Sequence, residues 1–351
     1  MNTGPFDVSV IIPVYNRGEL IRYTLESVRR ASAGLRVETI VVDDGSANPI
    51  AEDLRPMGYS VDQIIRQDNQ GLLFARLRGL RAAHGRTVQF LDSDDLVSPE
   101  KFRLQLAALD KTNAAVSSTG TARSVLGGPY EDLSIRPDPE PVAPVDTTRF
   151  FLETQPAPHV PLFRSDYLLD LVGTPLFPAS ARYNCVAEIW FYHIAATRPD
   201  RVAHVPGPHA VLGVHAGSRL TGQWERLGIA SLEVMEAFTR ACPPTAETLS
   251  ARTLVGEAAF NSWRRLPRGF DAGIQARLLA VWQQSPPGRL RKLGGPLFSF
   301  LARLLGPTGT GRLLRLRNAP YSKIRTLSDA ELRSLLQVPS LKEASPTALN
   351  S

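Results

Sequence analysis

The segment VQFLDSDDLVSPEK, residues 88–101, places three aspartates directly after an apolar run. The run Thr87–Leu91 predicts a buried strand, and Asp92, Asp94 and Asp95 follow where that strand ends. Carboxylates this close together repel one another and raise one another's pKa. We therefore expect a positively charged partner at this strand end.

The first 120 residues alternate short apolar runs with helical patterns. The expected strands are Val8–Ile12, Val37–Val42, Gln63–Arg66, Thr87–Leu91 and Ala114–Thr119. The expected helices are Glu19–Arg30, a short helix opened by Asn48-Pro49, Leu72–His84, and a helix from Ser98-Pro99 to about Asp110. This order predicts an α/β fold with a mostly parallel sheet flanked by helices on both faces. Ligands of such sheets bind outside the carboxyl ends of the strands, so the candidate site comprises the loops at residues 13–18, 43–47, 67–71 and 92–96.

The rest of the chain has a different pattern. Residues 127–161 form an irregular connection rich in Pro, Gly and acid, Ala181–Ala196 predicts a helix, and Arg198–Gly217 is interrupted by Pro and Gly. After Gln223 the pattern is helical and rich in Arg. The predicted division is therefore residues 1–222 as one α/β domain, with halves at 1–120 and 121–222, and residues 223–351 as a basic helical C-terminal extension.

Charge and cysteine content indicate the class of protein. The 351-residue chain has a net charge of +6, and residues 251–351 hold 16 Lys and Arg against 5 Asp and Glu. Cys185 and Cys242 form no CxxC pair, which favours a reducing compartment. The first residues lack a basic region followed by a long apolar region, and no apolar run approaches the roughly 20 residues of a spanning helix. We expect a cytoplasmic protein, with attachment to the inner face of the plasma membrane as a further hypothesis.

Two acidic clusters end two strands: Asp43 and Asp44 in VVDDGS, and the three aspartates of LDSDD. On a parallel sheet both clusters would face one crevice. Mg²⁺ or Mn²⁺ prefers carboxylate oxygens and usually takes one or two of them together with phosphate oxygens. The alternatives are a plain Asp-Gly turn in the first cluster and a capped loop before a helix in the second. A calcium EF-hand loop does not fit, because the sixth and twelfth positions from Asp92 are Val97 and Arg103.

The blocks VSVIIPVYNR, VVDDGS, NQGLLFARLRGL and VQFLDSDDLVSPEK occur in an order and spacing that resemble the family 2 glycosyltransferases. The resemblance is strong over residues 8–118 and weak over residues 180–220. It implies a GT-A-type, Rossmann-like fold that binds a nucleotide-sugar, a UDP-sugar above others, and transfers the sugar with inversion at the anomeric carbon.

The resemblance also assigns residues to the nucleotide. Pro13 and Tyr15 would line the nucleobase pocket, and Asp44 would accept a hydrogen bond from the base ring N–H. Arg76 would lie near the base and the phosphates, and Asp92 near the ribose or the sugar. The chemistry agrees, because uracil and thymine each offer a ring N–H donor that suits a carboxylate.

The same resemblance assigns the metal. Asp94 or Asp95 would hold Mn²⁺ or Mg²⁺, and Ser93, within the DxD motif, is counted with the residues that bind the nucleotide-sugar. The segment VHAGSRL resembles the family's closing H-x-x-S block, which would bring His215, and with it Ser218, to the diphosphate and the metal. The alternative for this short block is an ordinary loop. A zinc site of His204, His209 and His215 fits no common spacing.

An inverting transfer needs a general base for the acceptor hydroxyl. The segment CVAEIWFYHIAA matches the place where the family carries an acidic pair at a helix start, so Glu188 is the predicted catalytic base. Ala187 stands where the first member of that pair is expected. The alternative is that Glu188 is a surface or capping carboxylate, with the whole protein a non-catalytic nucleotide- or glycan-binding protein of the same fold. A nucleotidyltransferase is a second alternative, although PVYNRG is a poor phosphate loop.

The basic tail suggests a partner. Residues 289–317 mix Leu and Phe clusters with Arg, a composition suited to lying on an anionic membrane surface near a lipid-linked or other glycan acceptor. The alternative is a helical cap on the catalytic domain. Nucleic-acid binding is not expected, because no recognisable module is present. The segment GPTGTGRL at residues 306–313 mimics a P-loop spacing but lacks its Lys and Ser/Thr.

Overall fold

The computed structural model describes residues 5–59, 61–216 and 222–337. The strands are β1 (Val8–Val14), β2 (Val37–Asp44), β3 (Gln63–Gln67), β4 (Thr87–Phe90), β5 (Leu96–Val97), β6 (Val116–Val125), β7 (Arg136–Pro137), β8 (Leu162–Arg164) and β9 (Val202–Val214). The helices are α1 (Ile21–Ala31), α2 (Ile50–Leu54), α3 (Leu72–Ala82), α4 (Lys101–Thr112), α5 (Thr147–Arg149), α6 (Ser165–Gly173), α7 (Ala187–Ala195), α8 (Trp224–Ala241), α9 (Leu249–Arg265), α10 (Ala272–Gln283), α11 (Gly295–Arg315) and α12 (Asp329–Gln337).

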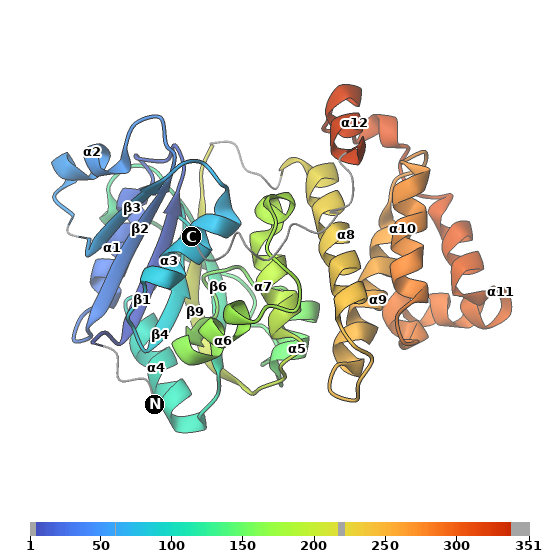
Figure 1. Cartoon of the computed structure of the whole chain (residues 1–351), viewed down its shortest axis with the longest axis horizontal. Coiled ribbons are helices and arrows are strands. Elements are labelled where there is room, and N and C mark those ends of the chain that lie inside the picture. Colours follow the sequence, from blue (N-terminus) through green and yellow to red (C-terminus); the bar gives the residue numbers. More distant parts are fainter. Residues whose placement is uncertain (1–4, 60, 217–221, 338–351) are drawn as a thin grey trace.

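The strands form one mixed sheet in the order β3-β2-β1-β4-β8-β6-β9-β5, with β7 beside β6. The first four are parallel, which confirms the sheet predicted from the alternation of strands and helices. β8 then runs antiparallel to both β4 and β6 and joins this half to the second. The predicted α/β fold with a mostly parallel sheet and a helical C-terminal region is therefore confirmed (Figure 1).

Alternating side chains of β1 fill two separate cores. Ile11 packs with α3 and α7 on one face of the sheet, whereas Val10 and Ile12 pack with α1 and α4 on the other. All three side chains are fully buried. A strand buried on both faces is a continuous apolar run, as parallel strands covered by helices require.

The helical region continues one of these cores. Side chains of α7, α8 and α9, among them Trp190, Phe238 and Phe260, belong to the same buried cluster as the sheet face that carries Ile11. Figure 1 shows α7 between the sheet and α8, with α10 and α11 farther out. The boundary at residue 222 stays a prediction, because apolar packing runs across it.

Two predictions about the second half are wrong. The segment Arg198–Gly217 was expected to be broken by Pro and Gly, but β9 runs as one strand along β6. The register shifts between Thr119, which pairs with Val205, and Thr121, which pairs with Ala210. This bulge accommodates the Pro-Gly-Pro segment, because the extra residues need no ladder hydrogen bonds.

The helix expected over Ala181–Ala196 is two elements. A 3₁₀ helix covers Ala181–Val186, and α7 begins after Val186, whose φ and ψ are −134° and 39°. The break places Glu188 in the first turn of α7.

The Asp43 carboxylate ties the loop after β2 together. The backbone N–H groups of Ser46 (2.9 Å) and Ile50 (3.2 Å) and the Arg66 guanidinium (2.5 Å) donate to it. Burial opposes the charged form, but the hydrogen bonds from Ser46, Ile50 and Arg66 outweigh it and lower the pKa of Asp43. Asp43 is therefore a structural carboxylate, although the sequence placed it in a ligand-facing cluster.

Asp43→Asn should lower the free energy of unfolding at pH 7 by about 2 kcal/mol, because it removes a buried charged acceptor. Because the pKa of Asp43 is lowered in the folded state, its carboxylate stabilises the fold at pH values above its unfolded-state pKa. This stabilisation is lost as the pH falls through the folded-state pKa. The difference between wild type and variant should therefore narrow below about pH 4 in urea titrations. The exposed Asp132→Asn is the control. A difference that is the same at pH 7 and pH 3 would contradict this role.

Candidate functional site

The carboxyl ends of the parallel strands form one edge of the sheet, and most predicted site residues lie there. Pro13 is buried in β1 opposite Val42, and Tyr15 follows the strand with half of its side chain exposed. Asp44 is the last residue of β2, and Asp92 follows β4. The sheet thus gathers three chain segments at a single edge, where open α/β sheets bind ligands.

Asp44 organises the loop that precedes α3. Its Oδ1 accepts from the Gln67 side chain (2.8 Å) and from the backbone N–H of Gln70 (2.9 Å), and its Oδ2 accepts from the backbone N–H of Gly71 (2.8 Å). A carboxylate oxygen has two acceptor sites. Oδ2 therefore keeps one acceptor site for a further donor, and the loop bonds fix the orientation of the carboxylate.

Arg76 joins two predicted site residues from opposite halves of the chain. From α3 its Nη2 donates to Asp92 Oδ1 (2.7 Å) and its Nη1 to Glu188 Oε2 (3.4 Å). The Arg76 side chain is 1% exposed, whereas Asp92 and Glu188 are 30% and 31% exposed. Sequence reasoning placed Arg76 beside the base and phosphates and missed this bridge.

The ion pairs of Arg76 affect the pKa values of the charged groups that they join. Burial disfavours the guanidinium, but Asp92 and Glu188 raise the pKa of Arg76 above its ordinary value. Burial raises the pKa of Asp92, and Asp95 and Asp94 add to the rise while Arg76 opposes it. The repulsion expected within the acidic cluster is therefore present, and Arg76 is one of the positive partners that it required.

Asp94 is held by two basic side chains. Arg17 Nη1 donates to Asp94 Oδ2 (2.5 Å), and His215 Nε2 lies 2.8 Å from the same oxygen and 2.9 Å from Arg17 Nη1. His215 directly follows β9, which pairs with β5 just after the aspartate loop. The structure thus brings together Asp94 and His215 as predicted. Arg17 was missed, although it stands at the end of the PVYNR block. Ser218 lies outside the described residues.

The Asp95 carboxylate points to internal partners instead. Its Oδ1 accepts from the backbone N–H of Gly213 (3.0 Å), and its Oδ2 lies 3.0 Å from Nδ1 of His159, which is fully buried. Ser93, which lies between Asp92 and Asp94 in the chain, is also buried. This geometry favours Asp94 over Asp95 as a metal ligand. His159 was missed because it lies in the irregular connection.

The donor set at Asp94 and His215 suits a divalent cation in part. A carboxylate oxygen and an imidazole nitrogen 2.8 Å apart are the ligand types that Mn²⁺ accepts. Within residues 5–59, 61–216 and 222–337, no group of three or more His, Cys, Asp and Glu side chains could hold a metal ion by itself. The pair fits a metal whose remaining ligands are diphosphate oxygens and water, as is usual for Mg²⁺.

The segment that contains these aspartates resembles a known family of proteins. The model for glycosyl transferase family 2 matches residues 9–158. Residues 9–158 of this chain therefore resemble the glycosyltransferases of family 2. The matched region contains the three aspartates and Arg76, and ends just before His159.

Curated relatives resemble about a third of this chain. The putative glycosyltransferase EpsH of Bacillus subtilis (strain 168) is 38% identical over 113 residues, which cover 31% of this chain and 32% of EpsH. The succinoglycan biosynthesis protein ExoO of Rhizobium meliloti (strain 1021) is 34% identical over 112 residues, 32% of each chain. The alignments thus span about a third of the relatives' length.

A solved structure has a similar fold over nearly the whole length of this chain. The crystal structure of S. aureus TarS 1-349 in complex with UDP-GlcNAc has a TM-score of 0.60 at 17% identity, covering 92% of this chain and 93% of that one. An identity this low shows a shared fold alone. Because 92% of this chain is covered, the shared fold includes the helical region.

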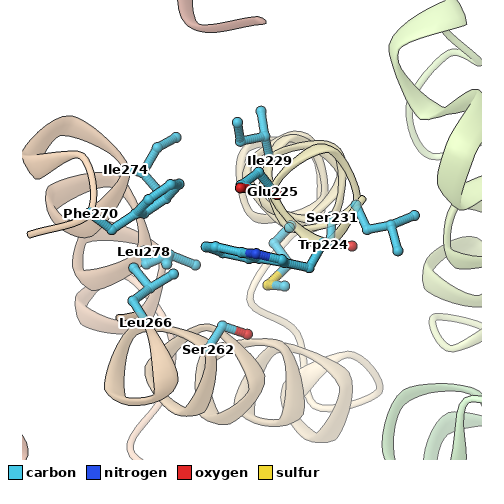
Figure 2. Close-up of a pocket in the computed structure, with 12 residues that line it drawn as sticks. Trp224, Glu225, Ile229, Ser231, Ser262, Leu266, Phe270, Ile274 and Leu278 are labelled. Carbon is cyan, nitrogen blue, oxygen red and sulfur yellow. The ribbon is translucent and has the colours of Figure 1, made fainter. Parts of the chain in front are cut away.

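A separate hollow lies in the helical region. It has a volume of about 270 Å³ between α8, α9 and α10, and its walls are mostly apolar. Figure 2 shows the Trp224 ring extending from α8 toward Phe270, Leu266 and Leu278, and the Trp224 and Phe270 rings are 5.2 Å apart. None of the predicted site residues lines it, and its apolar wall does not suit a nucleotide.

Gly213→Ala should disturb the aspartate loop. A Cβ at Gly213 would overlap the backbone carbonyl oxygen of Asp94, so the loop must shift. We expect a loss of roughly 1–3 kcal/mol of stability and at least a tenfold weaker nucleotide affinity, measured by urea titration and calorimetry. Gly228→Ala, where a Cβ has open space, is the matched control and should bind normally. Equal affinities in both variants would contradict the close contact.

Proposed function

We propose that this protein is an inverting glycosyltransferase that moves a sugar from a nucleoside-diphosphate sugar to an acceptor hydroxyl, with a divalent metal as cofactor. The observation that carries the proposal is the bridge from Asp92 through Arg76 to Glu188. It holds a partly exposed carboxylate of the acceptor half beside the aspartate loop of the donor half. Catalysis of a displacement requires the two reactants in this kind of fixed proximity.

The donor would lie along the strand ends. Tyr15 offers an exposed ring one residue beyond Val14, which pairs with Asp43, and Asp44 Oδ2 keeps an acceptor site that suits a ring N–H of uracil. The base would thus stack near β1, and the diphosphate would extend toward Asp92 and Asp94. TarS 1-349, which shares the fold, was crystallised with UDP-GlcNAc, and this supports UDP as the first donor nucleotide to test.

Asp94 and His215 would hold Mn²⁺ or Mg²⁺. A metal at this position would supply positive charge that stabilises the leaving diphosphate. In the described structure, Arg17 supplies positive charge to Asp94. Arg17 is therefore placed to orient this carboxylate and to balance negative charge at the same place.

Glu188 is the proposed general base. Its carboxylate would accept the proton of the acceptor hydroxyl, whose oxygen attacks the anomeric carbon while the bond to the diphosphate oxygen breaks and the configuration inverts. Arg76 orients Glu188 from below through a 3.4 Å contact and is itself fixed by Asp92. Ala187 is fully buried, so an acid at that position would be directed into the core. The missing first acid therefore does not remove an exposed carboxylate from the site.

The acceptor is proposed to be a glycan or a lipid-linked glycan of a cell-surface polysaccharide. Support comes from ExoO, which is named for succinoglycan biosynthesis. The acceptor side would be formed by the second half of the chain, around α7. This part lies largely outside the region matched by the family model.

Glu188→Gln tests the proposed base. Turnover should fall by roughly 10²–10⁴-fold, because the amide cannot take the proton, while nucleotide affinity changes little. Release of nucleoside diphosphate from a panel of sugar donors measures turnover, and calorimetry measures affinity. Glu247→Gln, an exposed position in the helical region, is the control.

Three outcomes would overturn the proposal. Unchanged turnover in Glu188→Gln would remove Glu188 as the base. Nucleotide binding by the wild type with no turnover on any donor would indicate a non-catalytic binding protein. Release of pyrophosphate would indicate a nucleotidyltransferase.

A thermal-shift panel tests the donor and the metal. UDP, dTDP, GDP and CDP, each with Mn²⁺ or with EDTA, should include one nucleotide that raises the Tm by about 2–4 °C at ~100 times its Kd, and only with metal. Asp94→Asn should lose this metal-dependent rise, whereas Asp132→Asn should keep it. A nucleotide shift that is equal with EDTA and with Mn²⁺ would contradict the metal-binding role of Asp94.

A further inference from the structure

Helix α11 exposes large apolar side chains on its outer side. Leu297, Phe300 and Leu304 follow at i, i+3 and i+7, which places them on one helix face. The exposed large side chains of α11 and the residue after it are Leu297 (67%), Phe300 (61%), Leu304 (72%), Leu305 (54%), Leu313 (49%) and Leu316 (65%). A run of exposed leucines this dense is unusual on a protein surface and marks a site of interaction.

The opposite side of α11 is firmly packed. Phe298 and Ala302 are buried, and Phe298 lies 5.8 Å from Phe260 of α9, ring centre to ring centre. Gly311 approaches Trp263 so closely that a Cβ there would overlap the indole ring. The helix bends at Gly306, where φ is 70° and Pro307 follows, and both halves stay against the core. The exposed leucines are therefore held outward by a fixed helix.

The same segment is strongly cationic. Residues 289–317 contain seven Arg and Lys and no Asp or Glu. Lys292 pairs with Glu153 at 2.6 Å. Among the described residues, none of the other six, Arg289, Arg291, Arg303, Arg312, Arg315 and Arg317, forms an ion pair with a carboxylate. The positive charge of this segment is thus largely uncompensated within the described chain.

We propose that the exposed apolar side chains on the two halves of α11, Leu297, Phe300 and Leu304 before the bend and Leu313 and Leu316 after it, dock with the arginines around them onto an anionic lipid bilayer surface. Leucine and phenylalanine enter the interface between headgroups and acyl chains, and arginine pairs with lipid phosphates. A second copy of this chain is a poor occupant, because a twofold contact would bring the two cationic segments against each other. A nucleic acid would use the arginines and leave the leucines exposed to water.

The docking surface and the glycosyltransferase site are separate. Figure 1 shows α11 at the end of the molecule farthest from the sheet, beyond α9 and α10. No helix of the described residues is long and apolar enough to cross a membrane, so α11 would lie on the lipid surface. Docking there leaves the strand ends uncovered, and the inference does not depend on the proposed catalytic mechanism.

Vesicle flotation of the full chain tests the proposal. Vesicles of phosphatidylcholine alone are compared with vesicles that contain 30 mol% phosphatidylglycerol, at low and at high salt. We expect binding to the anionic vesicles only, and weaker binding at high salt because screening reduces the attraction. Equal binding to both vesicle types, or no binding to either, would overturn the proposal.

Paired variants separate the apolar and the charge contributions. Phe300→Ser with Leu304→Ser should weaken binding at least tenfold, and Leu313→Ser with Leu316→Ser should act in the same direction. Arg303→Gln with Arg312→Gln should weaken binding roughly 25-fold, about fivefold per charge.

The controls are matched changes elsewhere on the surface. Val142→Ser with Leu249→Ser removes exposed apolar side chains, and Arg103→Gln with Arg333→Gln removes exposed charges, all outside residues 289–317. Both control pairs should bind like the wild type. All variants should keep the wild-type Tm and catalytic activity on a soluble acceptor. A wild-type dimer in solution that becomes monomeric with Phe300→Ser and Leu304→Ser would assign the surface to a second copy and overturn the proposal.

Discussion

The site depends on the two ion pairs that the buried guanidinium of Arg76 forms. The guanidinium lies between Asp92, which follows β4, and Glu188, which opens α7. Without it, two carboxylates from distant parts of the chain would share one region without a counter-charge, which is strongly unfavourable inside a protein. Because Arg76 is fully buried, its two contacts also fix how α3, the sheet and α7 meet.

Strand β9 makes the second connection across the site. Its pairing with β5 sets Gly213 against Asp95 and Asp94, and it ends immediately before His215. Neighbouring aspartates thereby acquire different roles. Asp95 contacts Gly213 and the buried His159, whereas Asp94 contacts Arg17 and His215. The repulsion expected within the acidic cluster is relieved by separate basic partners for each carboxylate.

Charge is divided along the molecule as well as within the site. The first 250 residues carry a net charge of −5, and the remainder carries +11. The acidic part contains the strand ends with their aspartates, and the basic part contains α11 with its exposed leucines. Electrostatic attraction to an anionic surface would therefore act mainly on the end of the molecule that lies away from the strand ends.

The parallel sheet and the loops at its strand ends are predictable from the sequence alone. Both follow from local patterns: β1 is an unbroken apolar run, and the aspartates stand directly after β4. The sequence also identified the carboxylates, because residue type and order along the chain carry that information. The break before α7 and the bulge in β9 were missed, since each depends on packing against elements distant in sequence.

Which side chains contact one another depends on the fold of the whole chain. Arg76 and Glu188 are 112 positions apart, and Asp94 and His215 are 121 apart, so no local pattern specifies these contacts. The same holds for His159. Its irregular segment has no pattern that predicts burial or a contact with Asp95. Chain pattern fixes the elements, because hydrogen bonding and side-chain periodicity are local. The partners of a buried charge are fixed by the fold, because the cost of leaving that charge unpaired acts across the whole core.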